Sequence, residues 1–198
     1  MYGTLSLRDG LASAEALARR AVALDNADAE ARARLGMTLW MRADYGGALA
    51  ETQGALAISP NLAYAHGIRG STLVFSGQPK EGIAALETCI RLDPRDPNLA
   101  ARLNHVALGF YFCGEYEAAI EAAKRAIRSY PNHPLAYRWL AAALGQAGRI
   151  DEARDVLAQA IAIAPASFDF YARQRVAWMR PQDHAHWLEG IRKAGWEG

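Results

Sequence analysis

The 198-residue sequence lacks a charge excess of either sign, because 22 lysines and arginines stand against 21 aspartates and glutamates. A nucleic-acid binder usually carries a basic patch or stripe, so this balance argues against such a partner. No apolar stretch approaches the roughly 20 residues of a membrane-spanning helix. The N-terminus lacks the basic start and apolar run of a secretory signal peptide. These absences predict a cytoplasmic protein that binds neither nucleic acid nor membrane.

Cysteine and catalytic motifs are equally scarce. Cys89 and Cys113 are the two cysteines, and we interpret them as small apolar fillers in a reducing compartment, with a disulfide between them as the alternative. The histidines are scattered, and His184 and His186 would face different sides of a helix. His105 is too distant from Cys113 to act as its base. No phosphate-binding glycine loop follows a strand. We therefore expect no enzyme, no cofactor and no metal site.

Proline, by contrast, recurs at nearly constant intervals. Pro60, Pro94, Pro131 and Pro165 are separated by 34, 37 and 34 residues. Small residues stand at fixed offsets before them, in three sets: Gly36, Gly70, Ala107 and Ala141; Ala48, Gly82, Ala119 and Ala153; and Ala55, Cys89, Ala126 and Ala160. A period of 34 with small residues at fixed offsets is typical of tetratricopeptide repeats. The predicted fold class is all-α, a right-handed α-solenoid of antiparallel helix pairs.

A turn divides each repeat into two helices. Gly77, Gly114 and Gly148 stand where a first helix must end, since glycine adopts the left-handed cap conformation without Cβ strain. The same place in the first repeat holds Asp44-Tyr45-Gly46-Gly47. We expect first helices at 28–42, 62–76, 97–113 and 134–147, and second helices at 45–58, 79–92, 116–129 and 150–163.

The third proline interval is three residues longer than the others, and the excess lies in Asp93–Pro97. Asp96 is a suitable N-cap, and Pro97 suits the first helical position. Three residues are nearly one helical turn. We therefore expect the helix at 97–113 to begin about one turn early and to project beyond its neighbours.

The start of the chain departs from the repeat pattern. Residues 11–25 match only the second helix of a repeat. The expected organisation is a half-repeat at 11–26 followed by four full repeats, and these are 29–62, 63–96, 97–133 and 134–167. Solenoids need polar terminal caps. An uncapped half-repeat therefore suggests a fragment of a longer protein, or capping by a second copy.

After Pro165 the pattern fades. We expect one more helix from Phe168 to Met179, and a last helix from Gln182 or Asp183 to about Lys193. Residues 168–198 are interpreted as a C-terminal cap of the single solenoid domain.

The tetratricopeptide pattern also implies which side chains face the concave side. These positions carry apolar and aromatic residues with few charges, as interaction sites usually do. We predict a groove for an amphipathic helix or an extended segment. The candidate groove residues are Met37, Trp40, Met41, Tyr64, Ser71, Val74, Phe75, Asn104, Leu108, Tyr111, Phe112 and Arg138, with His105 beside them; Ala101, Leu135, Ala142 and Gln146 share the same face.

Two other interpretations of these concave-side residues bear on the groove prediction. Trp40, Phe75 and Phe112 occupy similar places in successive repeats, so they could stack on one another between helices instead of binding a partner. The clamp that grips the C-terminal tails of heat-shock chaperones needs several lysines and asparagines on these faces. The faces carry almost no lysine, so that kind of clamp is not expected.

Five sequence segments resemble a more specific family. They are Pro60–Gly67, Arg91–Pro97, Gly114–Ile120, Gly148–Arg154 and Leu188–Trp196. Together they resemble the C-terminal tetratricopeptide region of bacterial class III adenylate/guanylate cyclase-like proteins, and similar regions follow winged-helix domains in related regulators. The resemblance covers roughly residues 11–196. None of the metal-binding aspartates of a cyclase can be placed here. The resemblance therefore implies a regulatory arm of a bacterial signalling protein and no catalytic role.

The leading functional hypothesis is a scaffold that binds a protein or peptide in its concave groove. One alternative is a structural module that forms a homo-oligomer through the uncapped half-repeat, using Leu17 and Val22. A further alternative is the tail of a cyclase whose catalytic domain is absent here.

Overall fold

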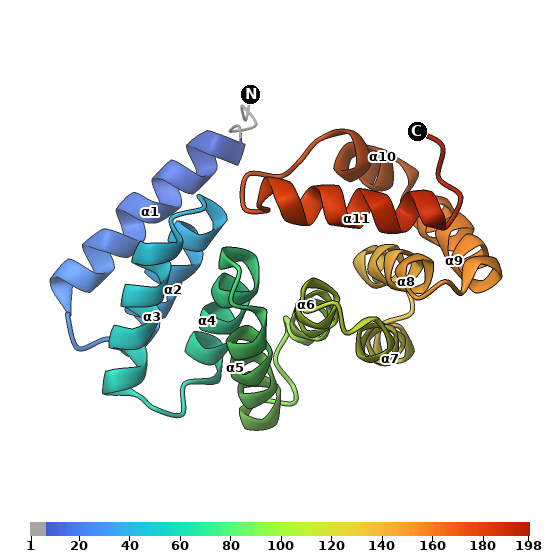
Figure 1. Cartoon of the computed structure of the whole chain (residues 1–198). Helices are drawn as coiled ribbons and strands as arrows, with labels where there is room; N and C mark the ends of the chain where they lie inside the picture. The colour runs from blue at the N-terminus through green and yellow to red at the C-terminus, as the bar shows by residue number, and fades with distance from the viewer. Residues whose placement is uncertain (1–6) are drawn as a thin grey trace.

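The computed structural model describes residues 7–198, and these residues form eleven α-helices and no β-strand (Figure 1). The helices are α1 Leu7–Leu24, α2 Ala29–Met41, α3 Tyr45–Ile58, α4 Ala63–Ser76, α5 Pro79–Leu92, α6 Leu99–Phe112, α7 Tyr116–Ser129, α8 Pro134–Gln146, α9 Ile150–Ile163, α10 Pro165–Arg173 and α11 Pro181–Lys193. The all-α prediction is confirmed. No helix within residues 7–198 has both the length and the apolar character needed to cross a membrane.

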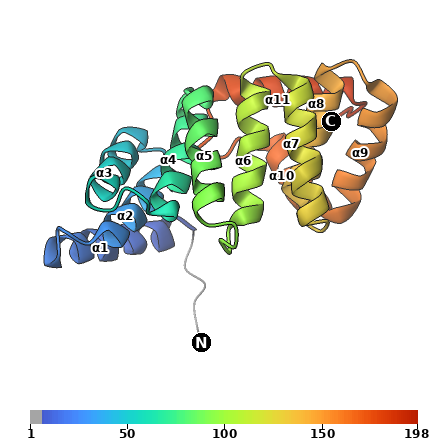
Figure 2. The same cartoon turned by 90° about the horizontal axis from the view of Figure 1, so that it is seen from below.

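Four antiparallel helix pairs form the body of the molecule. They are α2–α3, α4–α5, α6–α7 and α8–α9, and each pair packs against the next along an arc (Figure 1). Figure 2 shows the helices of successive pairs standing side by side. The chain is therefore an α-solenoid. The repeat borders at 29–62, 63–96, 97–133 and 134–167 stay a prediction, although each range contains one of these pairs.

Helix ends follow local side-chain chemistry. The Asp28 carboxylate accepts a hydrogen bond of 3.0 Å from the Ala31 amide, and Asp44 caps α3 in the same way through the Gly47 amide at 2.9 Å. Gly77 and Gly114 adopt φ values of +94° and +76° after α4 and α6, as the sequence predicts. In the first repeat Ala43 takes the left-handed conformation instead, with φ +63°.

Small residues mark the closest approach of paired helices. A Cβ added to Gly70 would lie 2.8 Å from the Gly82 carbonyl oxygen, and one added to Gly82 would lie 2.8 Å from the Gly70 carbonyl oxygen. At Gly36 an added Cβ would meet the Thr52 methyl carbon at 2.9 Å. Any larger side chain at these positions would separate the helix axes beyond their usual 8–10 Å. The fixed offsets seen in the sequence thus have a packing cause.

The first helix of the third repeat, α6, differs from its prediction. Helix α6 begins at Leu99 and has 14 residues, as α4 does, so it neither starts a turn early nor projects beyond its neighbours. The three extra residues of the third proline interval lie in the loop before α6. There the Asp96 carboxylate accepts a hydrogen bond of 2.8 Å from the Asn98 amide and pairs with Arg102 at 3.4 Å. Asp96 is buried. Its carboxylate therefore folds the loop inward instead of starting a helix at Pro97.

The C-terminal helices also differ in part. Helix α10 is Pro165–Arg173, shorter than the expected helix from Phe168 to Met179, and residues 174–180 are not helical. Residues 177 and 178 form a turn, and Arg175 stabilises this non-helical segment by donating a hydrogen bond of 2.5 Å from Nη1 to the Met179 carbonyl oxygen. The last helix, α11, is confirmed to within one or two residues of its expected start.

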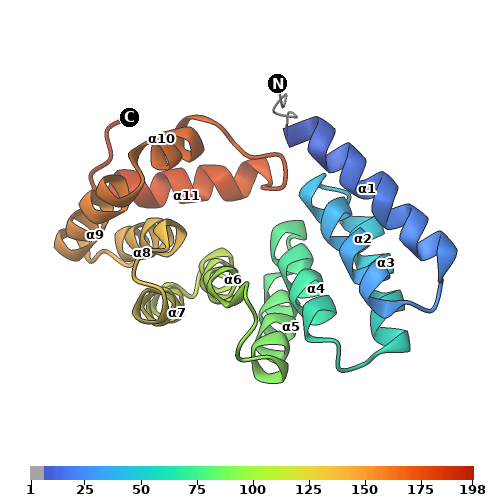
Figure 3. The same cartoon turned by 180° about the vertical axis from the view of Figure 1, so that it is seen from behind.

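The C-terminal segment, residues 165–198, turns back across the concave side instead of covering only the end of the array of helix pairs (Figures 1 and 3). Helix α11 lies against α8 so closely that a Cβ added to Gly145 would be 2.2 Å from the Gly190 carbonyl oxygen. Residues 174–180 then reach the first full helix pair, where the Tyr45 hydroxyl donates to the Trp178 carbonyl oxygen at 2.5 Å. The C-terminal segment therefore covers part of the concave side on which the sequence predicts a groove.

Candidate partner-binding cavity

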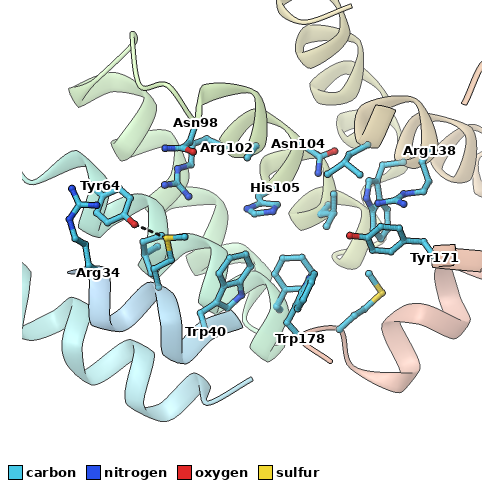
Figure 4. Close-up of a pocket in the computed structure, with 18 residues that line it drawn as sticks. Arg34, Trp40, Tyr64, Asn98, Arg102, Asn104, His105, Arg138, Tyr171 and Trp178 are labelled. Carbon is cyan, nitrogen blue, oxygen red and sulfur yellow. Dashed lines mark hydrogen bonds between the residues drawn. The ribbon is translucent and has the colours of Figure 1, made fainter. Parts of the chain in front are cut away.

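A cavity of about 460 Å³ remains on the concave side. Its walls come from α2, α4, α6 and α8, and the C-terminal segment closes one side (Figure 4). Eight predicted groove residues line it: Met37, Trp40, Tyr64, Phe75, Asn104, His105, Leu108 and Arg138. Ala101 and Leu135, expected on the same face, line it too.

Sequence reasoning missed eight lining residues: Arg34, Ile68, Asn98, Arg102, Trp139, Tyr171, Trp178 and Met179. A signal existed for three of them. Arg34, Ile68 and Trp139 stand 26 residues before their repeat prolines, as His105 does, so His105 alone should not have been singled out. Tyr171, Trp178 and Met179 belong to the C-terminal segment, whose path has no signal in the repeat pattern.

Five predicted groove residues lie elsewhere. Met41 lines a separate cleft of about 900 Å³ between α1 and the C-terminal segment. Val74 is fully buried against the α5 glycine, since a Cβ added to Gly82 would lie 2.7 Å from a Val74 methyl carbon. Tyr111 is fully buried beneath α11, where its hydroxyl donates to the His186 carbonyl oxygen at 2.8 Å. Val74 and Tyr111 therefore pack the interior, and none of these three side chains lines the cavity.

The aromatic side chains of successive repeats pack against one another in tilted or edge-to-face contacts. Ring centroids are 5.8 Å apart for Trp40 and Phe75, 6.4 Å for Phe75 and Phe112, and 5.5 Å for Phe112 and Trp139. Phe112 does not line the cavity, whereas Trp40 and Phe75 both belong to this aromatic row and face the cavity. Core packing and cavity lining, which the sequence presented as alternatives, therefore occur together.

Ser71, the fifth displaced residue, fixes the protonation of His105. Its hydroxyl is buried, donates to the Gly67 carbonyl oxygen at 2.9 Å, and lies 2.8 Å from His105 Nδ1. A hydroxyl has one proton, so Nδ1 must be the donor and Nε2 keeps its lone pair. Burial, reinforced by the nearby Arg102 charge, lowers the pKa of His105 to about 3. The imidazole is therefore neutral at physiological pH.

Arg138 is a buried cation with no carboxylate partner. Its side chain is 5% exposed, and no acidic residue within 7–198 forms an ion pair with it. The guanidinium carbon lies 3.8 Å from the centre of the Tyr171 ring, a cation–π contact. Burial lowers the pKa of Arg138 to about 10, so the group is still charged at neutral pH. By contrast, the equally buried Arg102 pairs with Asp96.

The opposite end of the cavity is built around Tyr64 (Figure 4). Arg34 and Arg102 lie 5.5 and 5.8 Å from the centre of its ring, and its hydroxyl donates to the Met37 sulfur at 2.7 Å. The cavity lining thus contains three arginines and, among the described residues, no aspartate or glutamate. Its walls are aromatic and its charge is positive.

No catalytic or metal-binding arrangement accompanies the cavity. Within residues 7–198 there is no group of three histidines, cysteines, aspartates or glutamates that could hold a metal ion. Cys89 and Cys113 are unpaired thiols, and burial raises the pKa of both. A raised pKa makes a thiol a poorer nucleophile at neutral pH.

Two models of the tetratricopeptide repeat match the sequence, one at residues 63–96 and the other at residues 114–173. The chain contains tetratricopeptide repeats. The matched ranges include helices α4–α5 and α7–α10, so they cover two of the helices that form the cavity walls, α4 and α8. Comparison with curated protein sequences gives no match.

Several solved structures share this tetratricopeptide fold. A fragment of MamA from Desulfovibrio magneticus RS-1 is 19% identical, with a TM-score of 0.68 over 80% of this chain and 88% of that one. YrrB, described as a TPR protein with an unusual peptide-binding site, is 20% identical, with a TM-score of 0.62 over 89% and 90%. PilW, described as a type IV pilus biogenesis factor, is 18% identical, with a TM-score of 0.72 over 93% and 81%. At these identities the similarity concerns the fold.

Proposed function

We propose that this protein is a non-catalytic, cytoplasmic scaffold that binds a protein or peptide segment on its concave side. The observation that carries the proposal is the cavity of about 460 Å³, which the repeats line with aromatic side chains and arginines. Large aromatic residues and arginine are the usual anchors of protein interfaces. The tetratricopeptide repeats support the same function, because such repeats serve as interaction scaffolds. YrrB, which shares the fold, is itself described as peptide-binding.

The closed C-terminal side restricts where a partner segment can bind. Helix α11 lies on α8 and covers Tyr111, so a long helix cannot lie along the whole concave face. Asn98 lines the cavity and is exposed, so we place the partner segment in the half of the cavity between Tyr64 and His105. A short segment that inserts an apolar side chain between Trp40 and Tyr64 fits this half.

A random peptide library displayed on phage tests the proposal. Peptides selected on the wild-type protein should bind with at least about tenfold weaker affinity to Trp40→Ala and Tyr64→Ala, since truncating an aromatic anchor costs about 2 kcal/mol or more. Arg128→Ala, an exposed α7 residue outside this cavity, is the matched control. Thermal unfolding of each variant checks that it is folded. Selected peptides that bind all three variants equally would refute cavity binding.

Self-association through α1 is a second candidate, favoured by two exposed leucines. Leu17 and Leu24 are 68% and 79% exposed on α1, and exposed apolar side chains of this size favour an interface. Val22 packs inward against α2 and its neighbours, so it is no part of this face, contrary to the sequence-based hypothesis. Sedimentation should show a concentration-dependent dimer that Leu17→Glu with Leu24→Lys abolishes. A monomer at all concentrations would dismiss this candidate.

The role as a regulatory arm of a bacterial signalling protein rests on the resemblance of five sequence segments to the cyclase-associated region. The gene sequence upstream of Met1 tests it. A nucleotide-cyclase or winged-helix domain in the same reading frame would support this role, and an unrelated domain there would contradict it.

A further inference from the structure

One of the three arginines that line the cavity has no carboxylate partner among the described residues. Arg34 pairs with Glu30 at 3.4 Å on the surface, and Arg102 pairs with Asp96 at 3.4 Å in the interior. Arg138 is as deeply buried as Arg102, yet no carboxylate within residues 7–198 neutralises it. A buried charge is costly unless it is paired and hydrogen-bonded. The repeat fold could place an apolar residue here, as it does with Ala33, which occupies the equivalent position in the first repeat.

Unpartnered polar atoms accompany this charge. Trp40 Nε1, a donor, and Asn104 Oδ1, an acceptor, are buried without any hydrogen-bond partner. Both side chains line the same cavity as Arg138, and Figure 4 shows where Trp40 and Asn104 lie relative to it. Buried polar atoms in folded proteins are satisfied in the great majority of cases. Two unsatisfied polar atoms, together with a buried guanidinium that has no carboxylate partner in the described part of the chain, therefore indicate a missing ligand.

We propose that this cavity binds an organic carboxylate whose apolar or aromatic body lies between Trp40, Phe75 and Trp178 and whose carboxylate pairs with Arg138. The inference goes beyond the scaffold proposal, because the same chemistry is offered by a free small molecule and by an acidic side chain of a peptide. It assigns the ligand's charge, its apolar part and the residue that recognises it.

The geometry of Arg138 suits a carboxylate. The guanidinium carbon lies 3.8 Å from the centre of the Tyr171 ring. A guanidinium can contact an aromatic face and also donate hydrogen bonds in its own plane to a carboxylate, so both contacts are compatible. A single uncompensated cation matches a monoanion. The second buried arginine already has its aspartate, so a doubly charged phosphate would be only half neutralised.

The size and enclosure of the cavity suit a small group. Its volume of about 460 Å³ falls within the range of small-molecule sites, which are mostly apolar with few convergent polar groups. Trp178 and Tyr171 belong to the C-terminal segment, which the Tyr45 hydrogen bond holds in place. The segment therefore makes a chamber from a groove that would otherwise be open.

Paired acid and amide probes test this inference by calorimetry. The free probes are 4-phenylbutyrate and 4-phenylbutyramide, and the peptide probes are acetyl-Phe-Glu-amide and acetyl-Phe-Gln-amide. At least one acid should bind at least about tenfold more tightly than its amide, as expected for charge-assisted hydrogen bonds. Which pair shows the discrimination identifies the source of the carboxylate. Equal binding of acid and amide in both pairs, or no binding of any probe, would overturn the proposal.

Variants locate the charge recognition. Arg138→Met should abolish the preference for the acid, while Arg20→Met, which removes an exposed charge on α1, should leave it unchanged. Arg138→Met should also melt no lower than the wild-type protein, because it removes an uncompensated buried charge. A preference that survives Arg138→Met would exclude this assignment.

A measurement on the wild-type protein makes the test independent of variant folding. The NMR signal of Arg138 Nε–H, assigned by its absence from the Arg138→Lys spectrum, should shift with the acid probe and not with the amide. An unmoved Arg138 signal at saturating acid would equally exclude the proposal. Failure of this inference leaves the phage-display test of the scaffold function unaffected, since that test uses Trp40 and Tyr64.

Discussion

The hydroxyl of Tyr45 donates a hydrogen bond of 2.5 Å to the carbonyl oxygen of Trp178, which lies 133 positions later in the sequence. Burial raises the pKa of Tyr45, so the phenol keeps its proton and is a donor throughout the physiological range. The Trp178 ring also lies 6.4 Å from that of Trp40. These contacts fasten the C-terminal segment to the first full helix pair and close the cavity.

Replacing Tyr45 by phenylalanine should loosen this closure. The change removes one hydrogen bond worth about 1 kcal/mol and leaves the ring in place. Amide hydrogen exchange in residues 174–180 should become about fivefold faster, and trypsin should cut more readily at Arg175. The matched control is Tyr137→Phe, whose hydroxyl bonds only the nearby Pro131 carbonyl oxygen. Equal exchange in both variants would show that the Tyr45 bond does not hold the segment.

The helix pairs could be predicted from the sequence because their determinants are local. Caps such as Asp44, glycines such as Gly77, and small residues at a fixed period lie within one repeat of the structure they specify. The start of α6 was missed, since the Asx turn of Asp96 competes with its role as an N-cap.

The path of the C-terminal segment could not be predicted, and this caused the main errors at the site. Tyr111 stands in the same register as Trp40, so the repeat pattern assigns both to the groove. Only the contact with His186, 75 residues away, shows that α11 covers Tyr111. Arg138 lines the concave cavity, but only the structure shows that it is buried beside Tyr171 without a carboxylate partner from residues 7–198.

Substituting Gly145 by alanine should displace α11 from α8. The new Cβ would lie 2.2 Å from the Gly190 carbonyl oxygen, and a main-chain atom cannot move aside as a flexible side chain can. Overpacking of this kind costs about 1–3 kcal/mol. Denaturant unfolding should show this loss, and exchange protection should fall selectively in α11.

Gly10→Ala provides the control for that substitution. An alanine Cβ at this α1 position would meet no described atom within 4 Å, and alanine favours a helix over glycine by about 0.5–1 kcal/mol. This variant should therefore be as stable as the wild-type protein or slightly more stable. If Gly145→Ala were equally harmless, the close packing of α11 on α8 would be contradicted.

Removing Asp96 should leave a buried cation without its partner. Asp96 and Arg102 have side chains only 8% and 5% exposed, and breaking a buried pair from one side costs about 3–5 kcal/mol. Asp96→Ala should lower the free energy of unfolding by this order. Asp151→Ala, which removes the fully exposed partner of Arg154, should change stability too little to measure. A small effect at Asp96 would mean that Arg102 finds water or another acceptor.

Stability should fall on acidification because His105 is held neutral. Burial lowers its pKa to about 3, whereas an unfolded histidine titrates near 6.5. Below pH 6.5 the unfolded chain therefore binds a proton that the folded chain does not, and stability decreases as pH falls. Between pH 7 and pH 5 this group should cost on the order of 2 kcal/mol.

His105→Asn isolates that contribution, since an asparagine amide retains an N–H donor for Ser71 and does not titrate in this range. Burial also lowers the pKa of His133 and His186, so both proteins should lose some stability at pH 5. The wild-type protein should lose about 2 kcal/mol more than the variant in urea unfolding measured at the two pH values. Parallel stability curves would show that His105 titrates at nearly the same pH in the folded and unfolded states, which would contradict its being held neutral by burial.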